Sequence, residues 1–420
     1  MTRDGGLLHL DKTERGAFVG AFIGWLFDYY EVFLLTFLLI PISAEFHLSG
    51  AASAWLVSTS LISMAVGGVL FGYVADRIGR RRVLMITVLT FTVATFARAL
   101  SPNYPVLLAL TAVAGVGLGG EYGVGQSLIS EVISAKRRGW WGGLFYGGAY
   151  LSIMLASVVG GQILPAIGWR WTFVLSGLPV LAVVYLRSHT PESAAWKETA
   201  AAERPPARAY VSRAFLGPLV KCLLAAVMYF WAYYGVTTLL PKYLVSSGFS
   251  MSNASWWIFF TAIAGLIGCV LSSWACDRWG RRPTLSLVMA LAAVGGLIVY
   301  IGGKALLGST WILVPFFILY FGSTAPTIFG TLFSEVFPTA LRSTGVSAAL
   351  QIARGTSALP PIIAAAVIAG PGYTPIFLGA TLLYAGVSAW AWVFPETRGM
   401  RIGTIDAAVR EEDPAAAPAP

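Results

Sequence analysis

Charged residues are scarce in this sequence. Only 11% of its 420 residues are Asp, Glu, Lys or Arg, whereas 57% are hydrophobic. A soluble domain carries about 25% charged residues, so the composition excludes an ordinary soluble fold. It predicts an integral membrane protein.

Cysteine and histidine are also rare, with three residues of each. Cys222, Cys269 and Cys276 lie in or beside apolar runs without metal-ligand spacing, so we expect packing residues and no disulfide framework. The three histidines stand in tails or near the ends of apolar runs, without a visible nucleophile, and no nucleotide-binding loop is present. We therefore expect no enzyme activity, no metal site and no cofactor.

Long apolar runs dominate the chain instead. A run of about 20 apolar residues crosses a bilayer as a helix. We count twelve such spans, and the fold class we predict is an all-α membrane protein made of two six-helix repeats. The expected spans are 17–40, 54–75, 83–101, 105–133, 140–164, 171–187, 217–245, 254–276, 283–302, 309–337, 344–369 and 373–394.

One long polar segment divides these spans into two sets of six. It is rich in Pro, Ala and charge, which is typical of a linker. We therefore predict an amino-terminal half at 1–187, a cytoplasmic linker at 188–213, a carboxy-terminal half at 214–400 and a disordered tail at 401–420.

The net charge of +9 raises the question of nucleic-acid binding. Most of the 28 basic residues fall in the tails, the linker and alternate short loops, as the positive-inside rule requires of a membrane protein. We therefore expect a lipid bilayer as the partner, with both termini cytoplasmic, and no nucleic acid. A bacterial inner membrane and a monomer are the expected setting.

Three motifs occur twice, in the same order. "VADRIGRRRVL" after the second span matches "ACDRWGRRPTL" after the eighth, "SEVISAKRRG" matches "SEVFPTALRSTG", and "TPES" matches "FPET". The second copy of each lies 201 to 204 residues after the first. This parallel duplication predicts two six-helix halves around a central site, an architecture typical of transporters with alternating access.

The doubled loop resembles the signature of the major facilitator superfamily, G-x-x-x-D-x-x-G-R-[RK]-[RK], and the resemblance covers nearly the whole chain. It implies a twelve-helix transporter whose cytoplasmic gate is held by charge networks. The gate residues that match are Asp76, Arg77, Gly79, Arg80, Arg81, Glu131 and Arg138, with Asp277, Arg278, Gly280, Arg281, Arg282, Glu335 and Arg342 in the second half.

Residue chemistry agrees with a gate at these loops. Gly79 and Gly280 suit a tight reversal of the chain, and the arginines that follow form forked hydrogen bonds to carboxylates. Glu335 and Arg342 stand seven residues apart, which would place both on one side of a helix end. The alternative is that these arginines only obey membrane topology. We favour gating because topology does not explain the paired acids.

Four ionisable residues lie well inside predicted spans: Asp28, Glu31, Glu121 and Arg354. A charge at that depth costs about 2.5–3.5 kcal/mol on insertion scales and usually marks function. Three acids exceed one arginine, so at least one acid must take up a proton. Asp28 and Glu31 share a helix face and should titrate together, which suits proton coupling. Glu121 is either a further proton site or the partner of Arg354. Arg98 and Lys304, near outer span ends, should snorkel to the surface.

Arg354 indicates the substrate. A buried guanidinium binds a carboxylate with two hydrogen bonds, and Gln351 lies on the same helix face. This segment resembles the arginine-bearing span of organic acid symporters, and "DYYE" resembles the two-acid motif D-G-[YF]-D of aromatic acid symporters with two replacements. "GLGGEYG" is similar to the sialate, lactate and metabolite symporter branches. Further pocket candidates are Tyr122, Gln126, Tyr150 and Tyr234, the last beside an expected helix break at Gly235.

Together these features favour a secondary transporter that imports a small organic monocarboxylate with protons. Two alternatives share the fold: a symporter of neutral sugars or polyols, whose pocket would not need Arg354, and an exporter of drugs or organic ions. A receptor without transport is a third alternative. It is disfavoured because both halves keep gate loops and neither carries a signalling domain.

Overall fold

The computed structural model describes residues 10–133, 137–188, 207–238, 240, 244, 249–307, 310–338, 341–369 and 374–398. All regular elements in these ranges are helices. They are α1 (Lys12–Glu45), α2 (Gly50–Ile78), α3 (Arg80–Ala99), α4 (Tyr104–Val132), α5 (Arg138–Val158), α6 (Leu164–Ser188), α8 (Arg213–Thr237), α10 (Met251–Trp279), α11 (Arg281–Leu307), α12 (Leu313–Gly322), α13 (Ala325–Val336), α14 (Arg342–Thr356), α15 (Leu359–Ala369) and α16 (Thr374–Trp390), with short 3-10 and π turns between some of them.

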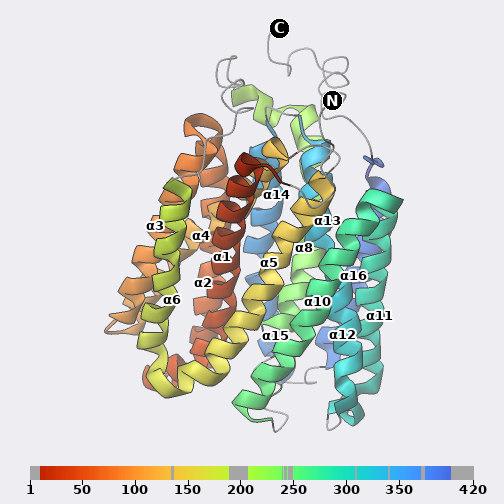
Figure 1. The fold of residues 1–420 in the computed structure, drawn as a ribbon. Helices are drawn as coiled ribbons and strands as arrows, with labels where there is room; N and C mark the ends of the chain where they lie inside the picture. Colours follow the sequence, from red (N-terminus) through yellow and green to blue (C-terminus); the bar gives the residue numbers. More distant parts are fainter. Residues whose placement is uncertain are drawn as a thin grey trace.

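The helices run side by side in one bundle (Figure 1). In this view α1, α2, α3, α4 and α6 lie on the left and α11, α12 and α16 on the right, with α5, α14 and α15 between them. The first six helices and the later ones meet where α5 packs on α10 and where α14 packs on α2. Most of the predicted linker and the whole predicted tail lie outside the described residues, so the division into halves stays a prediction.

Ten segments of the described chain are long and apolar enough to cross a membrane. One of them, Trp140–Gly177, contains the fifth predicted span and the first part of the sixth, 171–177. The two spans are separated where Gly168 adopts a φ of +77°. The predicted eleventh span is α14 plus α15, each too short to be counted alone. The prediction of a twelve-span helical bundle is therefore consistent with the structure.

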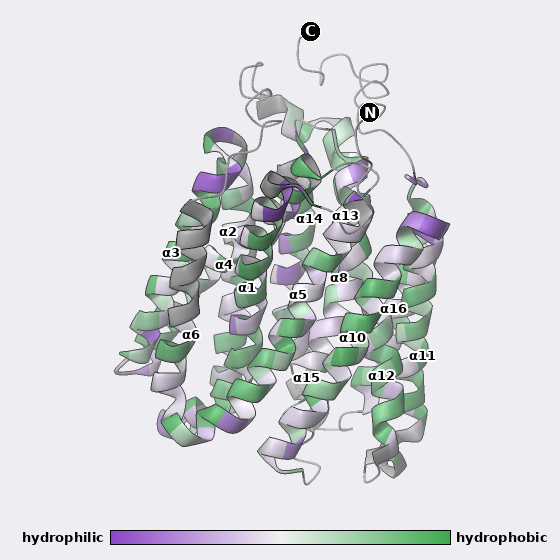
Figure 2. Ribbon diagram, viewed as in Figure 1, coloured by the Kyte–Doolittle hydropathy of each residue, from purple (hydrophilic) through white to green (hydrophobic). Residues whose placement is uncertain are grey.

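The surface of the bundle suits lipid. Large apolar side chains such as Val66, Val93 and Leu382 are exposed on the outer helix faces. Hydrophilic residues concentrate toward the helix ends, while the middle of the bundle is mostly hydrophobic (Figure 2). This distribution is the one that a bilayer imposes, because charge is costly in its apolar core.

α1 is the longest helix, with 34 residues. Its start is fixed by a capping box in which the Asp11 side chain accepts from the Glu14 backbone (2.7 Å) and Glu14 accepts from the Asp11 backbone (3.0 Å). The helix continues through Pro41 to Glu45. Its length therefore carries Asp28 and Glu31 to the middle of the bundle.

Two spans of the second half are broken at mid-length. α12 ends at Gly322 and α13 begins at Ala325, and α14 ends at Thr356 shortly before α15 begins at Leu359. Each break leaves backbone groups without their helical partners. By contrast, α8 runs unbroken through Gly235, so the expected break beside Tyr234 is wrong.

Glycines allow α2 and α4 to pack backbone against backbone. A Cβ built on Gly119 of α4 would lie 2.0 Å from the Met64 carbonyl oxygen and 2.6 Å from the Gly68 nitrogen, both in α2. Backbone atoms cannot yield as a flexible side chain does, so this approach requires a residue without a Cβ.

We expect Gly119→Ala to lower the thermal stability of the purified protein, because overpacking costs about 1–3 kcal/mol. Gly217→Ala is the matched control, since a Cβ at this helical position meets nothing within 4 Å. Alanine should leave that helix unchanged or slightly more stable. Equal melting temperatures for the two variants would show that α2 and α4 are not this close.

Candidate functional site

Arg354 and Asp28 face each other across the two sides of the bundle. Arg354 lies in the last turn of α14, and its Nη1 atom is 3.8 Å from Oδ2 of Asp28 in α1. The exposed fractions of the two residues are 2% and 0%. The structure therefore brings the predicted anion-binding residue beside one predicted proton-coupling residue.

This ion pair is only partly satisfied. Nε of Arg354 donates to the Tyr234 hydroxyl (3.3 Å) and Nη1 donates to Oε1 of Gln351 (3.4 Å). Among the described residues, Nη2 has no hydrogen-bond acceptor and neither oxygen of Asp28 has a donor. A buried charged group without its hydrogen bonds costs free energy unless another group satisfies it. The unused donor and acceptors therefore favour a site for a ligand.

Aromatic rings cover the same guanidinium. Its central carbon lies 4.8 Å from the ring centre of Tyr29 and 5.3 Å from that of Trp25. Cation–π contacts of this kind stabilise a buried cation without using its N–H donors. The rings thus pack against the guanidinium of Arg354 and leave its Nη2 donor available to a ligand.

Gln351 joins the site to the first half of the bundle. Its Nε2 atom donates to the backbone carbonyl of Gly119 in α4, while its Oε1 atom receives Nη1 of Arg354. Gln351 is fully buried. It therefore orients Arg354, as its place three residues earlier on the helix predicts.

The other two acids have partners elsewhere in the first half. Glu31 forms a buried ion pair with Arg98 of α3, and Arg98 also donates to Thr95 (2.8 Å) and lies 4.5 Å from the ring centre of Phe173. Glu121 accepts a short hydrogen bond from the Thr87 hydroxyl. Asp28 and Glu31 thus contact different arginines rather than sharing one partner.

Arg98 corrects one expectation directly. Its exposed fraction is 1%, so it does not snorkel to the membrane surface. Among the described residues, two arginines rather than one balance the three acids at this depth. The ion pair of Arg98 with Glu31 was not predicted, because Arg98 lies one residue from the end of α3 and such a position suggests exposure. Burial depends on how the helix is rotated, which the sequence does not show.

The remaining pocket candidates lie at different distances from Arg354. Tyr234 touches it directly, whereas Tyr150 donates its hydroxyl hydrogen to the Ser323 carbonyl (2.6 Å). Gln126 is buried, and neither its Oε1 nor its Nε2 atom has a hydrogen-bond partner among the side chains and backbone that are described. The side chain of Tyr122 lies outside the described residues.

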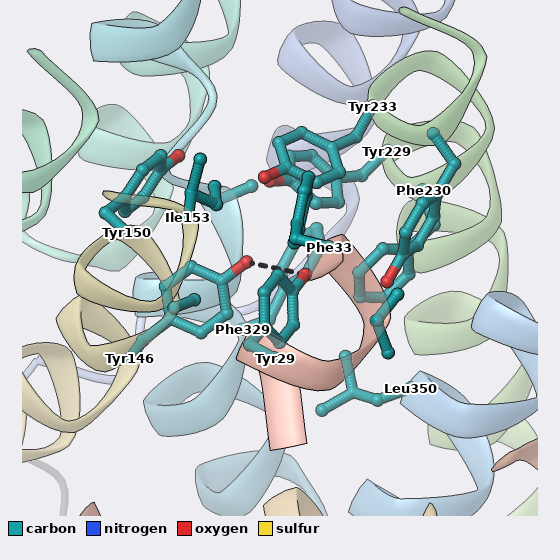
Figure 3. Packing of buried hydrophobic residues seen from close by; sticks show 14 of the residues in the cluster. Tyr29, Phe33, Tyr146, Tyr150, Ile153, Tyr229, Phe230, Tyr233, Phe329 and Leu350 are labelled. Atoms are coloured by element: carbon teal, nitrogen blue, oxygen red, sulfur yellow. Dashed lines mark hydrogen bonds between the residues drawn. The ribbon is translucent and has the colours of Figure 1, made fainter. Parts of the chain in front are cut away.

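Tyrosines gather between the two sides of the bundle (Figure 3). The hydroxyls of Tyr29 and Tyr146 lie 3.4 Å apart, and Tyr229 and Tyr233 stack with ring centres separated by 5.7 Å. Tyr146 and the segment "YFWAYYGVTTLLP", which holds Tyr229 and Tyr233, are also possible pocket residues by sequence, but only Tyr234 of that segment is favoured there, because aromatic residues in a bundle are usually packing residues.

The predicted gate of the second half is an ion-pair network. Arg281 forms a forked pair with Glu335, at 3.1 Å from Nε and 3.0 Å from Nη2, and its Nη1 atom lies 3.3 Å from Asp277. Gly280 makes the preceding turn with a φ of +106°. Glu396 then accepts from the backbone nitrogens of Arg281 (2.9 Å) and Arg282 (3.1 Å). Glu396 was missed as a gate residue, although the repeated "FPET" motif marks it.

One predicted gate contact is wrong. Glu335 and Arg342 do not lie on one helix end, since α13 ends at Val336 and Arg342 begins α14. Glu335 instead pairs with Arg281, and Nε of Arg342 donates to the Ser334 carbonyl (2.7 Å). We expected two continuous helical turns between Glu335 and Arg342, but the helix ends between them.

The equivalent gate of the first half is described only in part. Gly79 has the same φ of +106° as Gly280, and Nη1 of Arg80 donates to the Ala75 carbonyl (3.5 Å). Arg77 is exposed and lies over the ring of Tyr73. The side chains of Asp76, Glu131 and Arg138 lie outside the described residues.

The Major Facilitator Superfamily model matches residues 21–360. The chain belongs to this superfamily. It is therefore a multi-pass membrane transporter and not an enzyme, as the sequence predicts.

The chain is similar to transporters of known name. It is 30% identical to the cis,cis-muconate transport protein of Acinetobacter baylyi, over 89% of this chain and 93% of the relative. It is 27% identical to the niacin transporter NiaP of the same species, over 91% and 94%. The fold matches the proton:xylose symporter XylE, with a TM-score of 0.76 and 18% identity over 94% of this chain and 99% of that one.

We expect Arg98→Gln to destabilise the protein by about 3–5 kcal/mol, because it leaves Glu31 buried without its partner. The double variant Glu31→Gln with Arg98→Gln should recover part of this loss, since both charges are then removed. Thermal unfolding of the wild type, of Glu31→Gln and Arg98→Gln alone and of the double variant in detergent tests the pair. A double variant as unstable as the sum of the single variants would contradict the buried contact.

Proposed function

We propose that this transporter imports a small organic monocarboxylate together with protons. The observation that carries the proposal is the half-satisfied pair of Arg354 and Asp28, buried where the two sides of the bundle meet. A carboxylate matches the fork of a guanidinium. The muconate and niacin transporters named above support an organic acid as the substrate, whereas a neutral sugar or polyol would leave Arg354 without a role.

Charge balance explains why a proton should accompany the anion. Arg354 and Asp28 together are neutral when the site is empty. A bound carboxylate would leave one uncompensated negative charge, which is costly in a buried site. Protonation of Asp28 removes that charge and frees Arg354 for the substrate. The loaded transporter is then neutral and reorients at low cost.

Asp28 is the acid we propose as the proton carrier. Neither of its oxygens accepts a hydrogen bond from the part of the chain that the structure describes, whereas Glu31 is engaged by Arg98 and Glu121 by Thr87. Glu31 and Glu121 therefore already have hydrogen-bonded partners within the first half, whereas Asp28 faces the proposed anion site. The proton-coupling roles expected for Glu31 and Glu121 therefore stay predictions.

The cytoplasmic networks serve this cycle as a gate. Asp277, Arg281, Glu335 and Glu396 tie the start of α11 to the ends of the helices around it. We propose that the network holds the cytoplasmic side closed and separates when that side opens. The distribution of Lys and Arg supports both termini in the cytoplasm, and the bacterial relatives support a bacterial inner membrane as the location.

Uptake into proteoliposomes with an imposed pH gradient tests the substrate and the arginine. We expect carboxylates such as benzoate and lactate, rather than sugars, to include a transported compound. Arg354→Ala should lower its uptake by roughly 10- to 100-fold, since two charge-assisted hydrogen bonds are lost. Arg170→Gln is the control, because its ion pair with Glu45 is exposed. Unchanged uptake by Arg354→Ala would refute the anion site.

Asp28→Asn tests the coupling separately. Asparagine resembles the protonated acid, so exchange of internal for external substrate should continue, while accumulation driven by the pH gradient should disappear. Both are measured with the same radiolabelled substrate. Accumulation at the wild-type level by Asp28→Asn would overturn the assignment of Asp28.

The gate has its own test. Arg281→Lys keeps the charge but loses the fork, so we expect the transport rate to fall several-fold while substrate affinity in detergent is unchanged. Arg15→Lys, an exposed position on α1, is the control. An equal loss of binding and transport would place Arg281 outside a gate.

A further inference from the structure

Gln126 is a fully buried polar side chain that lacks a protein partner. Its exposed fraction in α4 is 1%, and neither Oε1 nor Nε2 has a hydrogen-bond partner within the described ranges of the chain. Burying an amide without hydrogen bonds costs free energy, because water would satisfy the same groups. That cost belongs to the conformation described here and would vanish in one where water reaches Gln126.

The amide lies between the anion site and the cytoplasmic gate. Along α4, Gln126 stands two helical turns, or about 10 Å, beyond Gly119, whose carbonyl accepts from Gln351 of the anion site. The helix then ends at Val132. Gln126 is thus nearer than the anion site to the gate end of α4.

Helices of both sides of the bundle enclose the amide. A Cβ built on Gly142 of α5 would lie 3.0 Å from Nε2 of Gln126 and 3.5 Å from Oγ1 of Thr331 in α13. Thr331 precedes Glu335, which pairs with Arg281 in the gate network, by one helical turn. Gln126 is therefore held between α4, α5 and α13, close to the gate.

The contacts beside the amide are equally close. A Cβ on Gly143 would lie 1.9 Å from Oγ of Ser273 in α10, and one on Gly123 would lie 1.8 Å from Oγ of Ser347 in α14. Glycines bring no polar side chain to this interface, and the Ser273 hydroxyl donates within its own helix, to the Cys269 carbonyl (2.6 Å). Close packing therefore surrounds the amide without offering it a partner.

We call this interface the cytoplasmic seam, and its residues are Gly123, Gln126, Gly142, Gly143, Ser273, Thr331 and Ser347. The gate network closes the same seam. The carboxylate of Asp277, which pairs with Arg281, also accepts a hydrogen bond from the Trp140 backbone at the start of α5. The network therefore joins α5 to α10 at the gate end of the seam.

Separation of the seam would change the surroundings of the amide. A transporter with alternating access opens by moving one half against the other, so α4 and α5 would then leave α10, α13 and α14. Water both donates and accepts hydrogen bonds, and it satisfies Oε1 and Nε2 together. The other residues of the seam lose packing contacts on opening, whereas Gln126 gains hydrogen bonds. It therefore favours the open seam over the closed one.

We infer that Gln126 is an opening residue, whose unpartnered amide destabilises the closed seam and thereby sets the fraction of protein with its cytoplasmic side open. This inference rests on the proposed function, since the cytoplasmic side must open along the seam. It gives Gln126, a pocket candidate by sequence, control of a conformational equilibrium in place of contact with the substrate.

Alkylation of a single cysteine in the purified full-length protein measures this equilibrium without any ligand. Cys222, Cys269 and Cys276 are replaced by alanine, and Ser273→Cys then puts a thiol against Gly143. N-ethylmaleimide reaches this thiol when the seam is open. The rate relative to that of the unfolded protein gives the ratio of open to closed protein.

Gln126→Met in this background keeps the length of the side chain and removes the amide. We expect the ratio of open to closed protein to fall by roughly 5- to 150-fold, the range for one buried unsatisfied polar group. Gln126→Leu repeats the test with another apolar shape. A ratio equal to or above that of the parent in both variants would overturn the inference, and a residue that only contacts the substrate would give that result.

Thr111→Val is the matched control on the same helix. Thr111 is fully buried, and its hydroxyl donates to the Leu107 carbonyl one turn earlier (2.8 Å). That partner moves with α4, so the ratio should stay within about twofold of the parent. An equal fall in Thr111→Val would show a general effect of buried polar groups and refute a role specific to Gln126.

Arg281→Lys separates this inference from the proposed function. Loss of the fork weakens the gate, so this variant should raise the ratio of open to closed protein. If it does so while both Gln126 variants match the parent, the gate stands and the opening residue fails. If the thiol of Ser273→Cys stays unreactive in the parent and in Arg281→Lys, the seam does not open, and the proposed gate fails together with the inference.

Discussion

A guanidinium buried in the middle of a membrane protein is the constraint on which the rest of this structure depends. Arg354 stays charged at any physiological pH, so its surroundings must supply negative charge, acceptors or π-electron density. Asp28, Gln351, Tyr234 and the ring of Tyr29 supply these together. They come from three helices, α1, α8 and α14. One charge thereby fixes how the two sides of the bundle meet.

The parts of the bundle that depend only on neighbouring residues in the sequence were predictable. Apolar run length gave the spans, and the repeated loops gave the glycine turns at Gly79 and Gly280. The breaks at Ser323 and Ser357 were not predicted, although the segments "GSTAP" and "RGTSALPP" contain the Gly, Ser, Thr and Pro residues that interrupt helices. Each depends on which neighbouring side chain replaces a lost backbone hydrogen bond, and that requires the three-dimensional packing.

Part of the candidate site was likewise predictable from the sequence and part was not. Asp28, Gln351 and Arg354 are polar residues in apolar runs and were recognised as such. Their partners could not be predicted, because they depend on how α1 is rotated about its own axis. Asp28 faces Arg354 of α14, whereas Glu31, only three residues further along, faces Arg98 of α3. Glu335 likewise forms its ion pair with Arg281 and not with Arg342 as expected. Residue type predicts chemistry at a site, while the choice of partner belongs to the packed structure.

The continuity of α1 has a mechanical consequence. The helix is unbroken from its capping box to Glu45, and Glu14 near its start forms an ion pair with Arg137, immediately before α5 (2.8 Å). Asp28 lies 14 residues further along the same rod, or about 21 Å at the helical rise. A stiff rod cannot absorb a displacement locally, as the broken helices opposite it can. A displacement of Asp28 along this helix would therefore reach the ion pair of Glu14 and Arg137 near its start.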